Sequence, residues 1–162
     1  MTITVTKVMT TETAHRLCKY AGKCAHIHGH SYRWEVTAAL ATRYVSDNGI
    51  AIDFAELKEV MREHIYERFD HALVLWSEDP LRGLTSHIAI STAADGTAQK
   101  IVWTPYNPTA EEFARDTAVR LQGQFRVNEL ALDLQIDSRP MVDIIRVRVW
   151  ETANSYGQWS GV

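Results

Sequence analysis

A long alternation of apolar and polar side chains is the strongest constraint on how this chain of 162 residues can fold. From His30 to about Thr42, apolar residues occupy every second position. The polar residues Arg33, Glu35 and Thr37 separate the first four of them. The apolar set is Tyr32, Trp34, Val36, Ala38 and Leu40. A period of two places one such set on a single face of a strand, so the segment predicts a half-buried antiparallel strand.

Other segments predict the remaining elements of a two-layer fold. Residues 2–9, 130–136 and 145–151 alternate in the same way, which predicts three more strands. Apolar residues at intervals of three and four predict amphipathic helices over about 54–68 and 108–125. Together these elements predict an α+β fold, with two helices on one face of an antiparallel sheet.

The least regular segment is 76–104, which proline and glycine interrupt. Within it, residues 87–90 and 100–103 could pair as a hairpin across Asp95-Gly96. We therefore expect a single domain over residues 1–162, with a hairpin insert at about 76–104.

The predicted sheet would have open edges, which in water are liable to pair with other strands. Joining these edges between subunits would close a barrel, so we expect a homo-oligomer. A net charge of −3 and a pI near 6.1 argue against a nucleic-acid or anionic-membrane surface. We expect no membrane span or signal peptide, reduced cysteines and a cytoplasmic location.

Histidines cluster at the start of the long strand. His28 and His30 are two residues apart, so a strand places both imidazoles on one face, with Gly29 between them. His15 would add a third imidazole, which is the ligand number of a catalytic zinc with one open position. His26 is a rival ligand, and copper, nickel or iron could occupy the same set.

Other polar residues each allow a structural and a chemical interpretation. Cys24 could be a small buried residue or, beside a metal dication, a thiolate base. Asp70 and His71 could cap the first helix or form a proton shuttle. Glu151 continues the apolar face of the last strand, where it either frays into solvent or binds paired N–H donors of a ligand. Glu111 is explained by its place in the first turn of a helix.

Six segments, spread from residue 13 to residue 152, resemble those of the 6-pyruvoyl-tetrahydropterin synthase superfamily. They are Thr13–Leu17, Lys23–Tyr32, Gly49–Lys58, Glu67–His71, Asn107–Glu111 and Val149–Thr152. The most specific feature is Cys24, which three residues separate from His28-Gly29-His30. This short spacer is similar to that of the 6-carboxy-tetrahydropterin synthase branch.

The resemblance implies a tunnelling fold, in which subunits join strand edges into a barrel, usually as a hexamer of two trimers. It also implies a zinc ion and assigns roles to several residues. The implied zinc ligands are His15, His28 and His30. The implied catalytic base is Cys24, the proton relay Asp70 with His71, and the carboxylates of the pterin pocket Glu111 and Glu151.

The substrate that the resemblance implies is 7,8-dihydroneopterin triphosphate. Loss of triphosphate and then of acetaldehyde would leave 6-carboxy-tetrahydropterin, a precursor of 7-deazaguanine and queuosine. The 6-pyruvoyl branch, which eliminates triphosphate only, and a catalytically silent pterin-binding or purine-binding module are the alternatives. Arg16, Lys19 and Lys23 form a basic cluster that either meets the triphosphate or is simply solvated.

Overall fold

The computed structural model describes residues 1–41, 47–83, 94, 96–133 and 142–161, and the side chains of residues 41, 123 and 125–133 are not described. Its core is a six-stranded sheet in the order β4-β3-β1-β2-β5-β6. The strands are β1 Thr2–His15, β2 His28–Ala41, β3 Ala72–Trp76, β4 Ile101–Thr104, β5 Asp143–Thr152 and β6 Ser155–Ser160. Neighbours from β1 through β2 and β5 to β6 pair antiparallel, as expected. The short strands β3 and β4 add parallel pairs.

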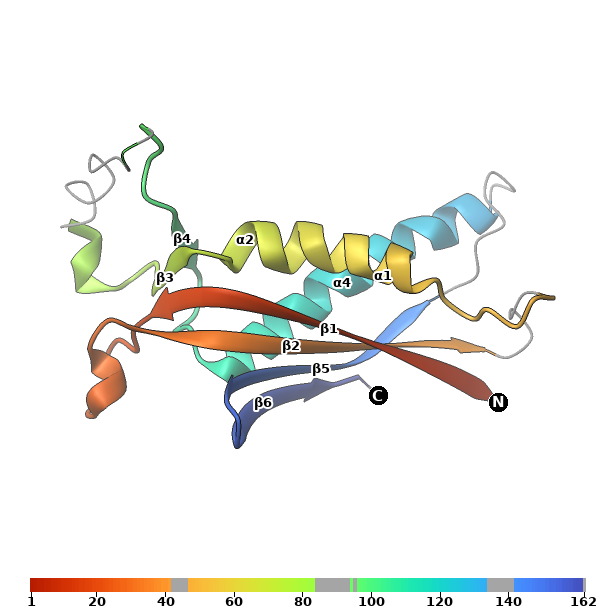
Figure 1. Ribbon diagram of the computed structural model, residues 1–162, viewed down its shortest axis with the longest axis horizontal. Helices are drawn as coiled ribbons and strands as arrows, with labels where there is room; N and C mark the ends of the chain where they lie inside the picture. The colour runs from red at the N-terminus through yellow and green to blue at the C-terminus, as the bar shows by residue number, and fades with distance from the viewer. Residues whose placement is uncertain (42–46, 84–93, 95, 134–141, 162) are drawn as a thin grey trace.

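Helices cover one face of this sheet (Figure 1). The helical elements are η1 Lys23–Ala25, α1 Phe54–Met61, the π-helical turn η3 Arg62–Tyr66, α2 Glu67–Phe69, η4 Pro80–Gly83 and α4 Ala110–Asp133. α1, η3 and α2 run on from one another and form the predicted first helix, which Asp53 caps by accepting a hydrogen bond from Ala55 N. Within the described residues, no helix is both long enough and apolar enough to cross a membrane.

The core lies between the helices and the sheet face that the alternation predicted. Tyr32, Trp34 and Val36 of β2 are fully buried on this face. The Trp34 ring stacks on Phe69 of α2 at 5.2 Å between centroids, and Phe113 of α4 packs beside both. Burying each such side chain contributes about 1.5–3 kcal/mol. The aromatic contacts therefore fix both helices to the strand that begins at the histidines.

Strand β5 contains a bulge near its start. Its register with β2 shifts so that Thr37 pairs with Arg146 but Ala38 pairs with Ile144, which leaves Ile145 as the extra residue. Ile144 is buried instead of Ile145, contrary to the simple alternation. Beyond the bulge, Val147 and Val149 face the core as predicted.

Residues 130–133 differ from the sequence prediction, and the hairpin predicted within 76–104 stays a prediction. The strand predicted over 130–136 is wrong for residues 130–133, which continue α4, and residues 134–136 lie outside the described ones. Leu and Glu are good helix formers, and extending an existing helix needs no new nucleation, so propagation overrides the short alternation. The first strand of the expected hairpin, 87–90, also lies outside the described residues, and β4 pairs with β3.

Candidate metal centre and substrate site

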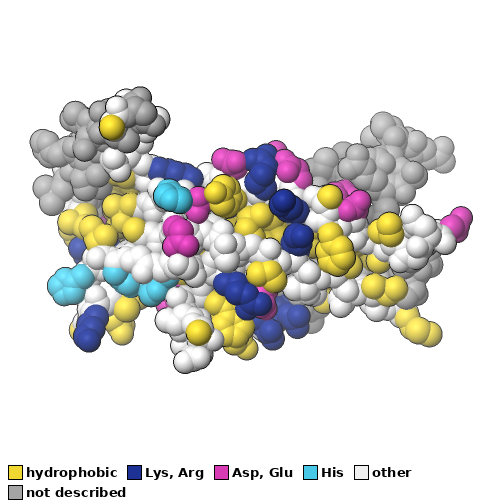
Figure 2. All heavy atoms as spheres, viewed as in Figure 1, with side chains coloured by type: hydrophobic (Ala, Val, Ile, Leu, Met, Phe, Trp, Pro, Cys, Tyr) yellow, Lys and Arg dark blue, Asp and Glu magenta, His cyan; other side chains and the backbone are white. Residues whose placement is uncertain are grey.

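Strand register brings three histidines to one end of the sheet. His15, the last residue of β1, lies directly opposite His28, the first residue of β2. His30 follows on the same face of β2. One ligand atom from each of the three rings lies within 4.8 Å of the others. Figure 2 shows histidine side chains reaching the surface at this end of the molecule.

Two main-chain carbonyls set which ring nitrogens are available. The Nδ1 atom of His15 lies 2.7 Å from the carbonyl oxygen of Pro108, and that of His28 lies 2.8 Å from the carbonyl oxygen of His26. Because a carbonyl can only accept, both Nδ1 atoms carry a proton, which leaves Nε2 as the nitrogen that a neutral ring can offer to a metal. This is how second-shell groups orient histidine ligands.

The nitrogens of this cluster fit a metal ion. His28 Nε2 is buried and has no hydrogen-bond partner among the described residues. Burial lowers the pKa of His15, although the Pro108 carbonyl and Glu151 oppose this. His15 is therefore neutral at neutral pH, which is the form that binds a metal. Such a buried imidazole nitrogen without a partner is expected where an ion completes the site.

Tyr32 connects the histidines to Glu151. Its hydroxyl donates to Glu151 Oε1 at 2.9 Å. The Tyr32 hydroxyl oxygen also lies 3.0 Å from Nε2 and 3.3 Å from Nδ1 of His15, so it is not on the lone-pair axis of Nε2. Burial raises the pKa of Tyr32 strongly, and the Glu151 carboxylate raises it further. The phenol therefore stays protonated and holds the carboxylate beside the metal cluster.

Cys24 lies in η1, in the loop that connects His15 to His28. Cys24 is half-buried, and its thiol does not form a disulfide with Cys18. A negative charge on this thiol is near enough to raise the pKa of Tyr32. Its carbonyl accepts from Leu17 N at 2.7 Å, which closes the loop. The structure thus places the predicted base in the neighbourhood of Tyr32.

Asp70 and His71 meet as predicted, at the end of α2. Asp70 accepts from the backbone N–H of Glu12 at 2.9 Å and from His71 Nδ1 at 2.8 Å. Burial alone would raise the pKa of Asp70, but these hydrogen bonds outweigh it and hold the pKa below its usual value. The carboxylate therefore stays ionised and fixes the His71 tautomer, which leaves Nε2 toward solvent.

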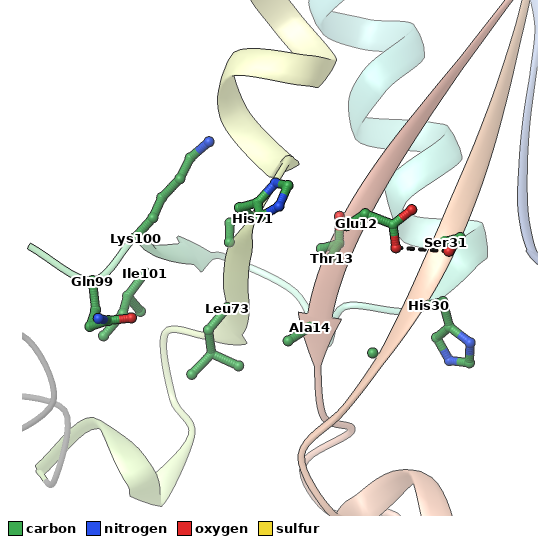
Figure 3. Close-up of a pocket in the computed structure, with 12 residues that line it drawn as sticks. Glu12, Thr13, Ala14, His30, Ser31, His71, Leu73, Gln99, Lys100 and Ile101 are labelled. Carbon is green, nitrogen blue, oxygen red and sulfur yellow. Dashed lines mark hydrogen bonds between the residues drawn. The ribbon is translucent and has the colours of Figure 1, made fainter. Parts of the chain in front are cut away.

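His71 opens onto a groove of about 500 Å³ over the ends of the strands (Figure 3). Lys100 and Gln99 lie on one side of this groove, and Ser31 and His30 lie on the other. Neither Cys24 nor Glu151 is among the residues that line it. Cys24 and the Asp70–His71 pair therefore do not share this groove.

Glu111 is exposed in the first turn of α4. Strand β6 crosses the helix there at Gly157, where an added Cβ would lie 2.4 Å from Glu111 N. Only glycine permits this close approach. The structure gives Glu111 a place beside β6 rather than a contact with the histidines.

The basic cluster considered for the triphosphate is partly engaged elsewhere. Arg16 Nε lies 3.1 Å from the buried Asp79 carboxylate. Lys19 Nζ lies 4.6 Å from the centroid of the Trp76 ring. These contacts favour a structural role for both cations.

Sequence reasoning missed the hydroxyl of Tyr32 and the carbonyl oxygens of His26 and Pro108. The alternation assigns Tyr32 to the core, which is correct for its ring. A buried phenol nevertheless needs a hydrogen-bond partner, and this requirement was the available signal. His26 proves to be exposed and contributes its main chain.

Comparison with known proteins places this arrangement in a family. The family model described as 6-pyruvoyl tetrahydropterin synthase matches residues 4–161. The chain belongs to the 6-pyruvoyl tetrahydropterin synthase family. Within this family, it is 30% identical over 157 residues to 6-carboxy-5,6,7,8-tetrahydropterin synthase of Haemophilus influenzae, covering 96% of each chain. It is also 35% identical over 103 residues to the Rickettsia felis protein of the same name, covering 64% of this chain and 68% of that one.

Solved structures of the 6-pyruvoyl tetrahydropterin synthase family share the fold. The Caenorhabditis elegans 6-pyruvoyl tetrahydropterin synthase superposes with a TM-score of 0.61 at 21% identity, covering 100% of this chain and 97% of that one. The Plasmodium vivax 6-pyruvoyltetrahydropterin synthase gives a TM-score of 0.64 at 16% identity, with 98% and 97% covered. The likeness confirms an α+β fold of this type, in which antiparallel pairs dominate the sheet.

Proposed function

We propose that the protein is a zinc-dependent 6-carboxy-5,6,7,8-tetrahydropterin synthase. It would convert 7,8-dihydroneopterin triphosphate to 6-carboxy-tetrahydropterin, acetaldehyde and triphosphate. The observation that carries this proposal is the convergence of His15, His28 and His30 beside the Tyr32–Glu151 pair. The names of the Haemophilus and Rickettsia relatives support the choice of reaction.

His15, His28 and His30 would hold the ion. Three neutral imidazoles with one position left open suit a catalytic zinc. When bound, zinc would supply a Lewis acid next to the oxygens of the substrate side chain. The main-chain carbonyls of His26 and Pro108 would keep the histidine rings oriented before any ligand arrives.

Glu151 would bind the pterin ring. A pterin presents an amino group and a ring N–H side by side, and one carboxylate can accept both. The hydroxyl of Tyr32 restrains the carboxylate through Oε1. This contact would orient the carboxylate so that the side chain of the substrate extends toward the histidines. We assign Glu111, at the start of α4, to the wall of the same pocket.

Cys24 would take a proton from the side chain of the substrate, and His71, oriented by Asp70, would relay protons. In one subunit, His71 lines a groove that Cys24 does not reach. We therefore propose that the Asp70–His71 pair serves a site completed by a neighbouring subunit.

The edges of the sheet support such an assembly. β1 pairs with β3 only over Thr13–His15. Among the described residues, no strand pairs with the rest of this edge, and β6 is the terminal strand on the opposite side. Unpaired edges of this kind favour pairing between chains. We propose a barrel of subunits joined from β1 to β6, as a trimer or hexamer.

One assay tests the reaction. The full-length protein, loaded with zinc, is incubated with 7,8-dihydroneopterin triphosphate, and the products are resolved by mass. Formation of 6-carboxy-tetrahydropterin with acetaldehyde supports the proposal. A 6-pyruvoyl product without acetaldehyde would assign the chain to the other branch. Binding of the pterin without turnover would identify a silent binding module and overturn the proposal.

A further inference from the structure

The side chain of Asn107 clamps the backbone of Cys18, which lies 89 residues away in the sequence. Its Oδ1 accepts from Cys18 N–H at 2.9 Å, and its Nδ2 donates to the Cys18 carbonyl at 2.8 Å. Both bonds are partly buried. One amide thus satisfies both main-chain groups of a loop residue, as a paired strand would.

The residues that follow Asn107 reach the metal centre. The carbonyl of Pro108 accepts from His15, and the hydroxyl of Thr109 caps α4 through Glu112 N at 3.3 Å. Thr109 N in turn donates to the carbonyl of Asn107 at 2.7 Å. Residues 107–109 therefore hold Cys18, orient the His15 ring and begin α4.

The clamped loop carries Cys24 and is held in an uncommon conformation. Lys19, directly after Cys18, has a positive φ of 59°, a backbone conformation that costs free energy for residues other than glycine. The bond from Leu17 N to the Cys24 carbonyl joins the two ends of this loop. Release of Cys18 would let the turn at Lys19 relax, and Leu17 would transmit the movement to Cys24.

We infer that Asn107 is a positioning residue, which sets the thiol of Cys24 relative to the histidine cluster by clamping Cys18. The inference rests on the proposed role of Cys24 as the catalytic base. Asn107 itself does not touch the substrate in this arrangement; it acts through the backbone of the loop.

The decisive measurement is the reactivity of the Cys24 thiol, because this does not require turnover. The chain has two cysteines, so Cys18→Ala leaves Cys24 as the only thiol, and the clamp survives because it uses main-chain atoms of residue 18. In this background and with zinc bound, Asn107→Ala is expected to raise the iodoacetamide alkylation rate of Cys24 several-fold. It is also expected to lower kcat by about tenfold with little change in KM, because a small displacement of a catalytic group slows the chemical step.

A matched control exists in the middle of α4. The side chain of Gln122 also clamps a strand, since it donates to Asp143 Oδ1 at 3.0 Å and accepts from Ile144 N at 2.8 Å. Gln122→Ala removes an equivalent pair of bonds far from the loop. It should cost similar stability and leave both the alkylation rate and kcat unchanged.

The outcomes separate the clamp from the proposed reaction. If Asn107→Ala and Gln122→Ala alkylate at the same rate, the inference is overturned, whatever the activity. If the alkylation rate rises but the parent protein shows no turnover, the clamp stands and the proposed function fails. Should Asn107→Ala not fold, Asn107→Asp keeps the acceptor for Cys18 N–H and loses the donor. An alkylation rate for it no higher than that of the parent would also overturn the inference.

Discussion

The metal cluster and the Asp70–His71 pair are held in different ways. At the cluster, backbone register sets His15 against His28, and main-chain carbonyls fix both Nδ1 protons. His15 is only 1% exposed. At the end of α2, Asp70 is anchored by Glu12 N–H, but the side chain of His71 is 79% exposed and its backbone has a positive φ of 53°.

This difference indicates which groups the contacts within one chain already hold in place. In the proposed ligand set His15 is buried and His28 and His30 are half-buried, and the three rings already lie close together, so metal binding should need little rearrangement. The relay imidazole is oriented on one side only and faces an open groove. The exposure of His71 is consistent with the proposal that a neighbouring subunit completes the site around it.

The largest expected effect comes from removing a ligand. We expect His28→Ala to weaken zinc binding by more than about 100-fold, because even outer-shell partners contribute 10–100-fold. Equilibrium dialysis followed by metal analysis measures this. His26→Ala is the control, since its contribution is a carbonyl that the substitution keeps. Equal losses in the two variants would contradict the assigned ligand set.

Separate variants of the base and the relay test whether the site is shared between subunits. Cys24→Ala and Asp70→Asn should each lower kcat by about 100-fold or more, the usual contribution of general acid–base groups. Both should retain zinc. Unfolding the two proteins together and refolding them as mixed oligomers should restore activity that neither has alone. No recovery in verified mixed oligomers would contradict a site built from two chains.

Removal of the phenol should have a smaller effect, confined to substrate binding. Tyr32→Phe removes the donor to Glu151 and leaves the histidines in place. Because a hydrogen bond to a charged group contributes about 1.5–3 kcal/mol, we expect KM to rise by about tenfold or more with zinc content unchanged. Loss of zinc from this variant would instead mean that Tyr32 supports the metal.

The smallest effect should appear in stability against pH. Folded Asp70 binds its proton more weakly than the unfolded chain does. Its stabilising contribution is therefore complete above the ordinary aspartate pKa of about 3.9 and is lost as pH falls through the lower folded pKa. Wild type should be more stable than Asp70→Asn at neutral pH, and the difference should shrink in acid. Urea unfolding of both proteins at neutral and at acidic pH measures this difference in the free energy of unfolding. A difference that grows in acid would contradict the lowered pKa of Asp70.

The sequence predicts well which side chains share one face of a strand, and poorly which residues lie opposite them on the neighbouring strand. Alternation places Trp34 in the core and His28 beside His30, because the period of a strand is local. It cannot reveal that His15 lies opposite His28, since β1 was predicted to end at residue 9. Register depends on which strands meet, and that is a property of the whole sheet.

Side-chain roles that depend on distant main-chain atoms were equally hidden. Nothing near Asn107 in the sequence announces a bond to Cys18, and Pro108 was expected only to start a helix. The strand β6 was missed for a related reason. Its residues lack an apolar alternation, and it is held by pairing with β5 and by the close contact at Gly157.

The bulge at Ile145 shifts the alternation of inward and outward side chains in β5 by one residue. The extra residue changes the phase of everything that follows, so Val147, Val149 and then Glu151 face the helices. Without the bulge, an unbroken alternation from Ile144 would turn Trp150 toward the helices and Glu151 to the opposite face. Related chains that tolerate insertions and deletions elsewhere should therefore keep the length of this strand between the bulge and its terminal carboxylate.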